Sequence, residues 1–174
     1  VFRMEPDEIS SIEVRQDNAF WTLQKNSEDE WMLSYKGSYE TDPEEVQTVV
    51  TTLGNLKMVS FVQKQDDTTT PGSFGLASPD ISVVINGNEA DALHVGNRVV
   101  PDERFFARKK GSEEIFTISA AAVELLSKNP SHFRRKGFLP WPAAESTGIK
   151  VIADNSYTSL VKDNQDKWMI ENKP

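Results

Sequence analysis

The chain has 174 residues, of which 37% are hydrophobic and 9% aromatic, and this composition excludes an intrinsically disordered protein. Its formal net charge of −8 argues against nucleic-acid binding, because an acidic surface repels a phosphate backbone. Cysteine is absent, which excludes disulfides, thiol nucleophiles and thiolate metal ligands.

The first predicted elements form a three-strand meander. Ser10–Gln16 alternates apolar and polar residues, and the apolar stretches Phe20–Leu23 and Trp31–Leu33 follow it. Asp17-Asn18 predicts the first turn, and the polar stretch Asn26–Glu30 predicts the second.

A helix is predicted next, because the spacing of the apolar residues changes. Asp42 suits the N-cap, Pro43 suits the first helical position, and Glu45 stands where a capping box places its acidic residue. One apolar stripe follows at helical spacing, made of Val46, Val49, Val50, Leu53 and Leu56. Met58–Val62 is a candidate short strand after this helix.

The second half of the unit predicts a polar loop, four strands and another helix. The loop is Gln63–Ser73, and the strands are Ile81–Ile85, Leu93–Val95, Arg104–Arg108 and Ile115–Ile118. Turns at Asn86-Gly87 and Lys110-Gly111 favour antiparallel pairing. Ser119 is expected to cap a helix through about Ser127 that ends before Asn129-Pro130, and Phe133–Gly137 is expected to be a basic connector.

The sequence then begins to repeat itself. Ile12–Leu33 aligns with Ile149–Ile170 at an offset of 137 positions without a gap, and nine of the 22 pairs are identical. We therefore predict one full repeat unit over residues 1–137 and the opening of a second over 138–174, with the same strand–turn–strand path. Pro174 corresponds to Gly37, which precedes the predicted helix. We expect the second copy to dock within the chain through Phe138, Leu139 and Trp141, or else to pair with another molecule through a strand edge.

Candidate chemical groups are few. His94 and His132 are the two histidines, and neither has sequence neighbours at the spacing of a metal site or a catalytic base. Asp66 and Asp67, with Thr68–Thr70, lack the pattern of a calcium loop, and Ser73 lacks the flanking glycines of a nucleophile elbow. We therefore predict no catalytic, cofactor-binding or metal-binding residue, and no cofactor.

Two surface features allow either a functional or a plain interpretation. Trp31 and Trp168 occupy equivalent positions, and the pair suits a stacking platform or a core aromatic; their repetition favours the core. The clusters Arg108–Lys110 and Arg134–Lys136 suit anionic lipid or a partner, or else a solvated turn and linker, which is the plainer interpretation.

Several motifs in order resemble DUF4340, a domain of unknown function. They include Phe74-Gly75-Leu76 with Pro79, the strand Phe105-Phe106-Ala107-Arg108, and the tandem copies. The resemblance implies a bacterial protein, often with an N-terminal membrane anchor and often encoded beside ABC-transporter components of the gliding-motility type. It implies no activity and no catalytic residue.

These observations together predict an α+β fold with an antiparallel sheet of about seven strands and two helices, followed by the first strands of a second repeat. We expect a non-enzymatic accessory or interaction domain on the extracytoplasmic side of the inner membrane, with a protein partner in a transport complex. The alternative is a module that binds an envelope polymer or a small molecule. No apolar run reaches the roughly 18 residues of a spanning helix. The sequence begins with Val1, so we expect any anchor or signal to lie outside it.

Overall fold

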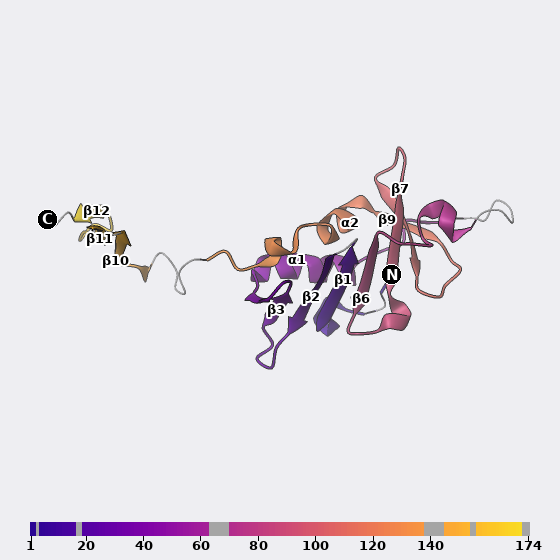
Figure 1. The fold of residues 1–174 in the computed structure, drawn as a ribbon, viewed down its shortest axis with the longest axis horizontal. Helices are drawn as coiled ribbons and strands as arrows, with labels where there is room; N and C mark the ends of the chain where they lie inside the picture. Colours follow the sequence, from indigo (N-terminus) through magenta and orange to yellow (C-terminus); the bar gives the residue numbers. More distant parts are fainter. Residues whose placement is uncertain (3, 17–18, 63–69, 138–144, 154–155, 172–174) are drawn as a thin grey trace. The chain divides into compact units, whose positions relative to one another are not determined.

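The computed structural model describes residues 1–2, 4–16, 19–62, 70–137, 145–153 and 156–171. It divides into two compact units, Val1–Arg135 and Lys136–Pro174, which are described separately below. The predicted antiparallel α+β architecture is confirmed (Figure 1). Asp17-Asn18, Asp66, Asp67, Thr68, Phe138, Leu139 and Trp141 lie outside the described residues.

The first unit contains one antiparallel sheet of nine strands in the order β4-β3-β2-β1-β6-β7-β8-β9-β5. The strands are β1 Ser11–Gln16, β2 Ala19–Lys25, β3 Trp31–Ser34, β4 Ser38–Glu40, β5 Ser60–Phe61, β6 Ile81–Ile85, β7 Leu93–Val99, β8 Arg104–Lys109 and β9 Phe116–Ser119. The count exceeds the predicted seven because two short strands form the sheet edges: β4, which was not predicted, and β5, which lies within the candidate strand Met58–Val62. Edge strands need little apolar pattern, since only one side of each is paired.

The described residues of this unit also form two α-helices, which lie on one face of the sheet (Figure 1). Helix α1 spans Pro43–Gly54, and Asp42 caps it by accepting a hydrogen bond from the Glu44 N–H at 3.1 Å. Helix α2 spans Ala120–Leu126; Ser119 occupies the N-cap position, but its side chain makes no capping bond. The predicted stripe Val46, Val49, Val50, Leu53 and Leu56 is buried in the core, as expected for residues packed against the sheet, although Leu56 follows the end of the helix at Gly54.

The predicted capping box on α1 is wrong. The Asp42 N–H, which a capping box would satisfy with Glu45, instead donates to the Phe133 carbonyl at 2.9 Å. Phe133 belongs to a 3-10 helix, η4 (Pro130–Phe133), and is fully buried with its ring centroid 5.2 Å from that of Trp21. The predicted basic connector therefore begins with a core residue, because the chain returns to pack beside the start of α1.

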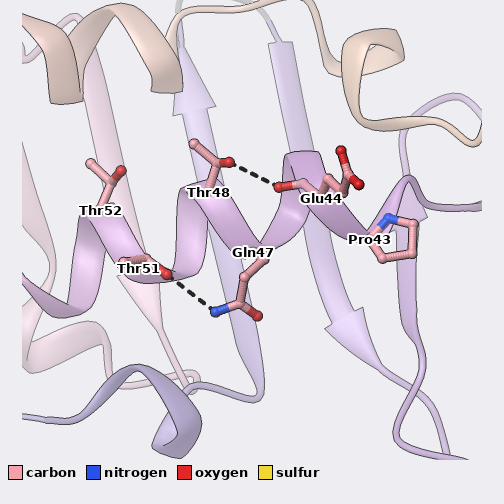
Figure 2. Close-up of a pocket in the computed structure, with 6 residues that line it drawn as sticks. All are labelled: Pro43, Glu44, Gln47, Thr48, Thr51 and Thr52. Atoms are coloured by element: carbon pink, nitrogen blue, oxygen red, sulfur yellow. Dashed lines mark hydrogen bonds between the residues drawn. The ribbon is translucent and has the colours of Figure 1, made fainter.

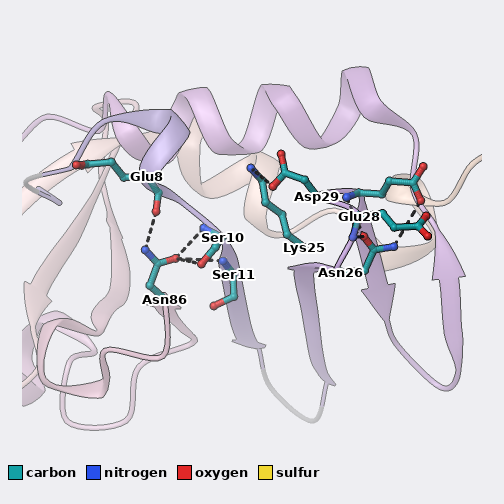
Figure 3. Close-up of polar contacts among 9 residues, drawn as sticks. Glu8, Ser10, Ser11, Lys25, Asn26, Glu28, Asp29 and Asn86 are labelled. Carbon is teal, nitrogen blue, oxygen red and sulfur yellow. Dashed lines mark hydrogen bonds and ion pairs between the residues drawn. The ribbon is translucent and has the colours of Figure 1, made fainter.

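Asn86 lies in the turn after β6 and has a positive φ of 51°. Its side-chain oxygen accepts from the Ser10 and Ser11 N–H groups at 2.8 and 3.1 Å, and its amide donates to the Glu8 carbonyl at 2.8 Å (Figure 3). These bonds hold the turn after β6 against the start of β1. The two 3-10 helices nearest this turn are η1 (Pro6–Glu8) and η3 (Glu89–Asp91).

The second unit contains a three-stranded antiparallel sheet of β10 (Gly148–Ala153), β11 (Ser156–Lys162) and β12 (Trp168–Glu171). Each bound lies 137 positions after the corresponding bound of β1, β2 or β3. The register is also the same: Ile12 pairs with Leu23 and Ile149 with Leu160, while Leu23 pairs with Leu33 and Leu160 with Ile170. The predicted common strand–turn–strand path is confirmed.

Candidate functional site

The family motifs of the first unit meet on the sheet face opposite the helices. The 3-10 helix η2 (Pro71–Phe74) places Phe74 over Phe106 of β8, with ring centroids 4.6 Å apart. The Arg108 Nη2 donates to the Leu76 carbonyl at 2.9 Å. A Cβ atom on Gly96 would lie 2.2 Å from the Phe74 carbonyl oxygen, so only glycine permits this approach. The Phe-Gly-Leu and Phe-Phe-Ala-Arg motifs therefore form one packed structural element.

His94 lies directly opposite Arg108 across the β7–β8 pair. Among the described residues, its Nδ1 atom and the Arg108 Nε atom are buried without a hydrogen-bond partner. Burial is the main cause that lowers the pKa of His94 below its usual range, and the charges of Arg108 and Lys110 add to it. The ring is therefore neutral near pH 7, which fits the predicted structural role.

His132 is held by a residue that is remote in sequence. Its Nε2 lies 2.6 Å from Oε2 of Glu45, on α1, and 3.0 Å from Nζ of Lys128. The ring edge also packs on Phe133, with centroids 5.5 Å apart. Since Glu45 already engages Nε2, we assign this pair to holding η4 against α1. The sequence did not predict this pair, because its two residues are 87 positions apart.

Four residues of the two basic clusters make ion pairs or a ring contact within the first unit. Lys109 pairs with Asp91 at 2.8 Å and Lys110 with Glu89 at 2.9 Å. In the second cluster, the Arg134 guanidinium lies 3.7 Å from the Tyr39 ring centroid, and Arg135 pairs with Glu40 at 3.2 Å. These contacts go to η3 and to β4, while Lys110, Arg134 and Arg135 remain exposed, as the prediction of a solvated turn and linker expected.

Several hollows indent the first unit, and their linings differ in polarity. One follows the outward side of α1 and is lined by Pro43, Glu44, Gln47, Thr48, Thr51 and Thr52 (Figure 2). Its polar groups bond one another or the helix: Gln47 Nε2 donates to Thr51 Oγ1 at 3.1 Å, and Thr48 Oγ1 donates to the Glu44 carbonyl at 2.9 Å. A small-molecule site would present such groups to a ligand. Within the described residues, no group of three or more His, Asp or Glu side chains is placed to hold a metal ion.

The turns of the two repeated hairpins agree in detail. In the first unit, Asn26 Oδ1 accepts from the Glu28 and Glu30 N–H groups, both at 2.9 Å (Figure 3). In the second unit, Asp163 Oδ1 accepts from the Gln165 and Lys167 N–H groups at 2.7 and 3.0 Å.

Asp29 and Asp166, three positions after Asn26 and Asp163, have the same backbone conformation and the same kind of ion pair. Asp29 and Asp166 both have a positive φ, 64° and 62°, and each pairs with the lysine four residues before it, at 3.0 and 3.6 Å. The two copies therefore share their local geometry.

The two copies differ in the solvent exposure of their equivalent apolar side chains. Ile12, Val14 and Leu33 are fully buried under the helices of the first unit. Their counterparts Ile149, Val151 and Ile170 are 38%, 55% and 65% exposed. Equivalent residues on equivalent strands are thus core in one unit and surface in the other.

We name this surface the β10–β12 apolar face; it consists of Ile149, Val151, Leu160, Trp168 and Ile170. Trp168 is 42% exposed, whereas Trp31 is partly buried against the core. The prediction that both tryptophans are core aromatics is therefore wrong for Trp168, because no helix of the second unit covers it within the described residues. Sequence reasoning found the repeat but could not show this exposure.

The model of the family described as "Domain of unknown function (DUF4340)" matches residues 1–72 and 69–174. The chain belongs to this family. Comparison with curated proteins and with solved structures gave no match. In this DUF4340 chain, the motifs that carried the resemblance occupy the packed element around Phe74 and Arg108, while the exposed apolar surface lies on the repeated hairpin. No helix among the described residues is long and apolar enough to cross a membrane.

Proposed function

We propose that this DUF4340 chain is a non-enzymatic interaction domain that contacts a protein partner through the β10–β12 apolar face. The observation that carries the proposal is the exposure of Ile149, Val151 and Ile170, at positions whose counterparts are fully buried in the first unit. Contiguous exposed apolar surface marks interaction sites more often than chance exposure does.

The distribution of exposed side chains supports this assignment. Among the described residues, seven large hydrophobic side chains are exposed in the second unit and five in the longer first unit. Four of the seven, Ile149, Val151, Trp168 and Ile170, lie on the β10–β12 apolar face. A three-stranded sheet with an uncovered apolar face gains little stability from burial, and small sheets of this kind are marginal in water. A partner that covers the face would stabilise the unit and gain affinity from the same apolar area.

The proposal places the partner in an ABC-type transport complex, on the extracytoplasmic side of a bacterial inner membrane, with membrane contact through an anchor outside this sequence. The support is the genomic setting that the family resemblance implies.

The test is purification of the affinity-tagged, membrane-attached protein after cross-linking in cells. We expect transporter components to co-purify with the wild type and to be lost with Ile170→Lys, which puts a charge on the β10–β12 apolar face. The matched control is Phe20→Lys, since Phe20 is also exposed, at 51%, but belongs to the first unit. Equal recovery from both variants would refute the proposed contact surface.

A further inference from the structure

We propose that the β10–β12 apolar face binds an amphipathic helix of a partner protein, one with an aliphatic stripe and an acidic first turn. The inference rests on the proposed function and names the chemistry of the partner. It follows from the repeat, because the first unit contains the same hairpin with its covering element in place.

That covering element is α1. Its stripe Val46, Val49, Val50 and Leu53 is at most 4% exposed and shares one core with β1, β2 and β3. Figure 2 shows the helix lying across the strands, with its polar side turned away from them. Apolar residues at such spacing form the stripe by which a helix packs on a sheet. The interface between helix and hairpin is therefore established within this molecule.

The hairpin residues of that interface recur in the second unit. Ile12, Val14 and Leu23 are identical to Ile149, Val151 and Leu160, and Leu33 is replaced by Ile170. Since the strand register is also the same, these four aliphatic positions recur at the same spacing. Trp21, which pairs with Val14 on the same face and is 1% exposed, is replaced by Thr158, so the incoming helix meets a smaller side chain at that place.

The charge of Lys167 indicates which residues the first turn of the incoming helix should carry. In the first unit, Glu30 and Pro43 line the same groove, so position 30 lies beside the start of α1. The counterpart of Glu30 is Lys167, which replaces a negative charge by a positive one. A helix N-terminus carries a partial positive charge, so a lysine beside it favours a helix whose first turn supplies carboxylates. Helix α1 has this composition, with Glu44 and Glu45 in its first turn.

The experiment uses the full chain and a probe peptide taken from the chain itself. The peptide spans residues 38–56, which include β4 and α1, and carries a fluorophore for anisotropy measurements. Helix formation on binding is followed by circular dichroism. A control peptide carries Val50→Asp, which interrupts the aliphatic stripe.

The matched protein variants are Ile170→Lys and Met169→Lys. Both side chains are well exposed, at 65% and 55%, so neither change should disturb folding. They are neighbours on β12 and therefore point to opposite faces of the sheet. A third variant, Lys167→Glu, reverses the charge at the expected helix start.

We expect the peptide to gain helix on binding and the Val50→Asp peptide not to bind. Ile170→Lys should weaken binding by about tenfold or more, the effect of losing one buried aliphatic side chain, and Met169→Lys by less than about twofold. Lys167→Glu should weaken binding roughly threefold at low salt, with the difference shrinking as salt is added.

Two results would overturn the inference. One is equal binding to the Ile170→Lys and Met169→Lys proteins. The other is self-association of the chain in light scattering that Ile170→Lys abolishes while the peptide fails to bind, which would make a second copy the occupant. Failure of the peptide with intact Ile170-dependent co-purification would remove the helix but keep the interaction function. Peptide binding without Ile170-dependent co-purification would remove the function instead.

Discussion

Truncating the side chain at the same position in the two repeats measures how much that position contributes to the stability of each unit. Leu33 is fully buried in the first unit, and its counterpart Ile170 is 65% exposed in the second. Both lie on the third strand of the hairpin and pair with an equivalent leucine, Leu23 or Leu160. Leu33→Ala should lower the free energy of unfolding by about 2–5 kcal/mol, from lost transfer free energy plus the cavity left behind. Ile170→Ala should change it by less than about 0.5 kcal/mol, as exposed substitutions do.

The assay is urea unfolding followed by tryptophan fluorescence. Trp21 is 1% exposed and belongs to the first unit, so its emission reports on the core that contains Leu33. With an m-value of about 1–3 kcal/mol per molar urea, Leu33→Ala should lower the midpoint by roughly 1–2 M. Amide hydrogen exchange then separates the units, since β1–β3 should lose protection in Leu33→Ala. Equal midpoint shifts for the two variants would refute the argument, because they would mean that Ile170 is as buried as Leu33.

Three further outcomes are expected. Leu53→Ala should cost about 2–5 kcal/mol of stability, and an unchanged melting curve would show that α1 is peripheral. Gly96→Ala should cost about 1–3 kcal/mol because its Cβ meets the Phe74 carbonyl at 2.2 Å, whereas Gly72→Ala, whose nearest contact is 3.5 Å, should be tolerated in thermal unfolding. His94 has a lowered pKa in the folded state, so the unfolded state takes up protons first as pH falls. Stability should therefore be fully present above about pH 6.5 and decline below it, and His94→Gln should reduce that decline in pH-dependent melting curves.

Much of the fold could be predicted because its signals are local. Asp42, Pro43 and one apolar stripe predict helix α1. In the structure the Asp42 side chain caps this helix by accepting a hydrogen bond from the Glu44 N–H, as expected. Strand β4 (Ser38–Glu40) was missed, because three residues with a single partly buried tyrosine carry no periodic pattern.

Other elements could not be predicted because their causes are remote in sequence. Phe133 sits in a basic stretch that looks like a linker, yet it is buried against Trp21. Glu45 was expected to complete a capping box, but the chain brings His132 within 2.6 Å of it. In both cases the contact partner comes from a segment that is distant in sequence and is brought near by the tertiary fold. The spacing of residues in the sequence does not indicate such a contact.

The candidate surface shows the same division between local and remote causes. The repeat itself was visible in the sequence, and its turn residues explain why both hairpins follow one path. Asn26 and Asp163 bind equivalent N–H groups, and Asp29 and Asp166 adopt the same positive φ. Burial, however, depends on what lies over the strands. Identity between Trp31 and Trp168 therefore predicted the backbone correctly and the environment of Trp168 wrongly.

Where the two copies differ, the path is kept: Asp163 replaces Asn26 and binds the equivalent N–H groups. Arg15 becomes Ile152, which is 69% exposed, and Glu30 becomes Lys167. The strand register is kept despite these two substitutions. Ile152 alternates with Ile149 and Val151 along β10, so this change lies on the sheet face opposite the β10–β12 apolar face. On the apolar face itself the four aliphatic positions are kept, and the change that bears on an incoming helix is Lys167 at one end. A kept aliphatic row with a reversed charge at the expected helix start is what a hairpin that receives a helix with an acidic first turn would show.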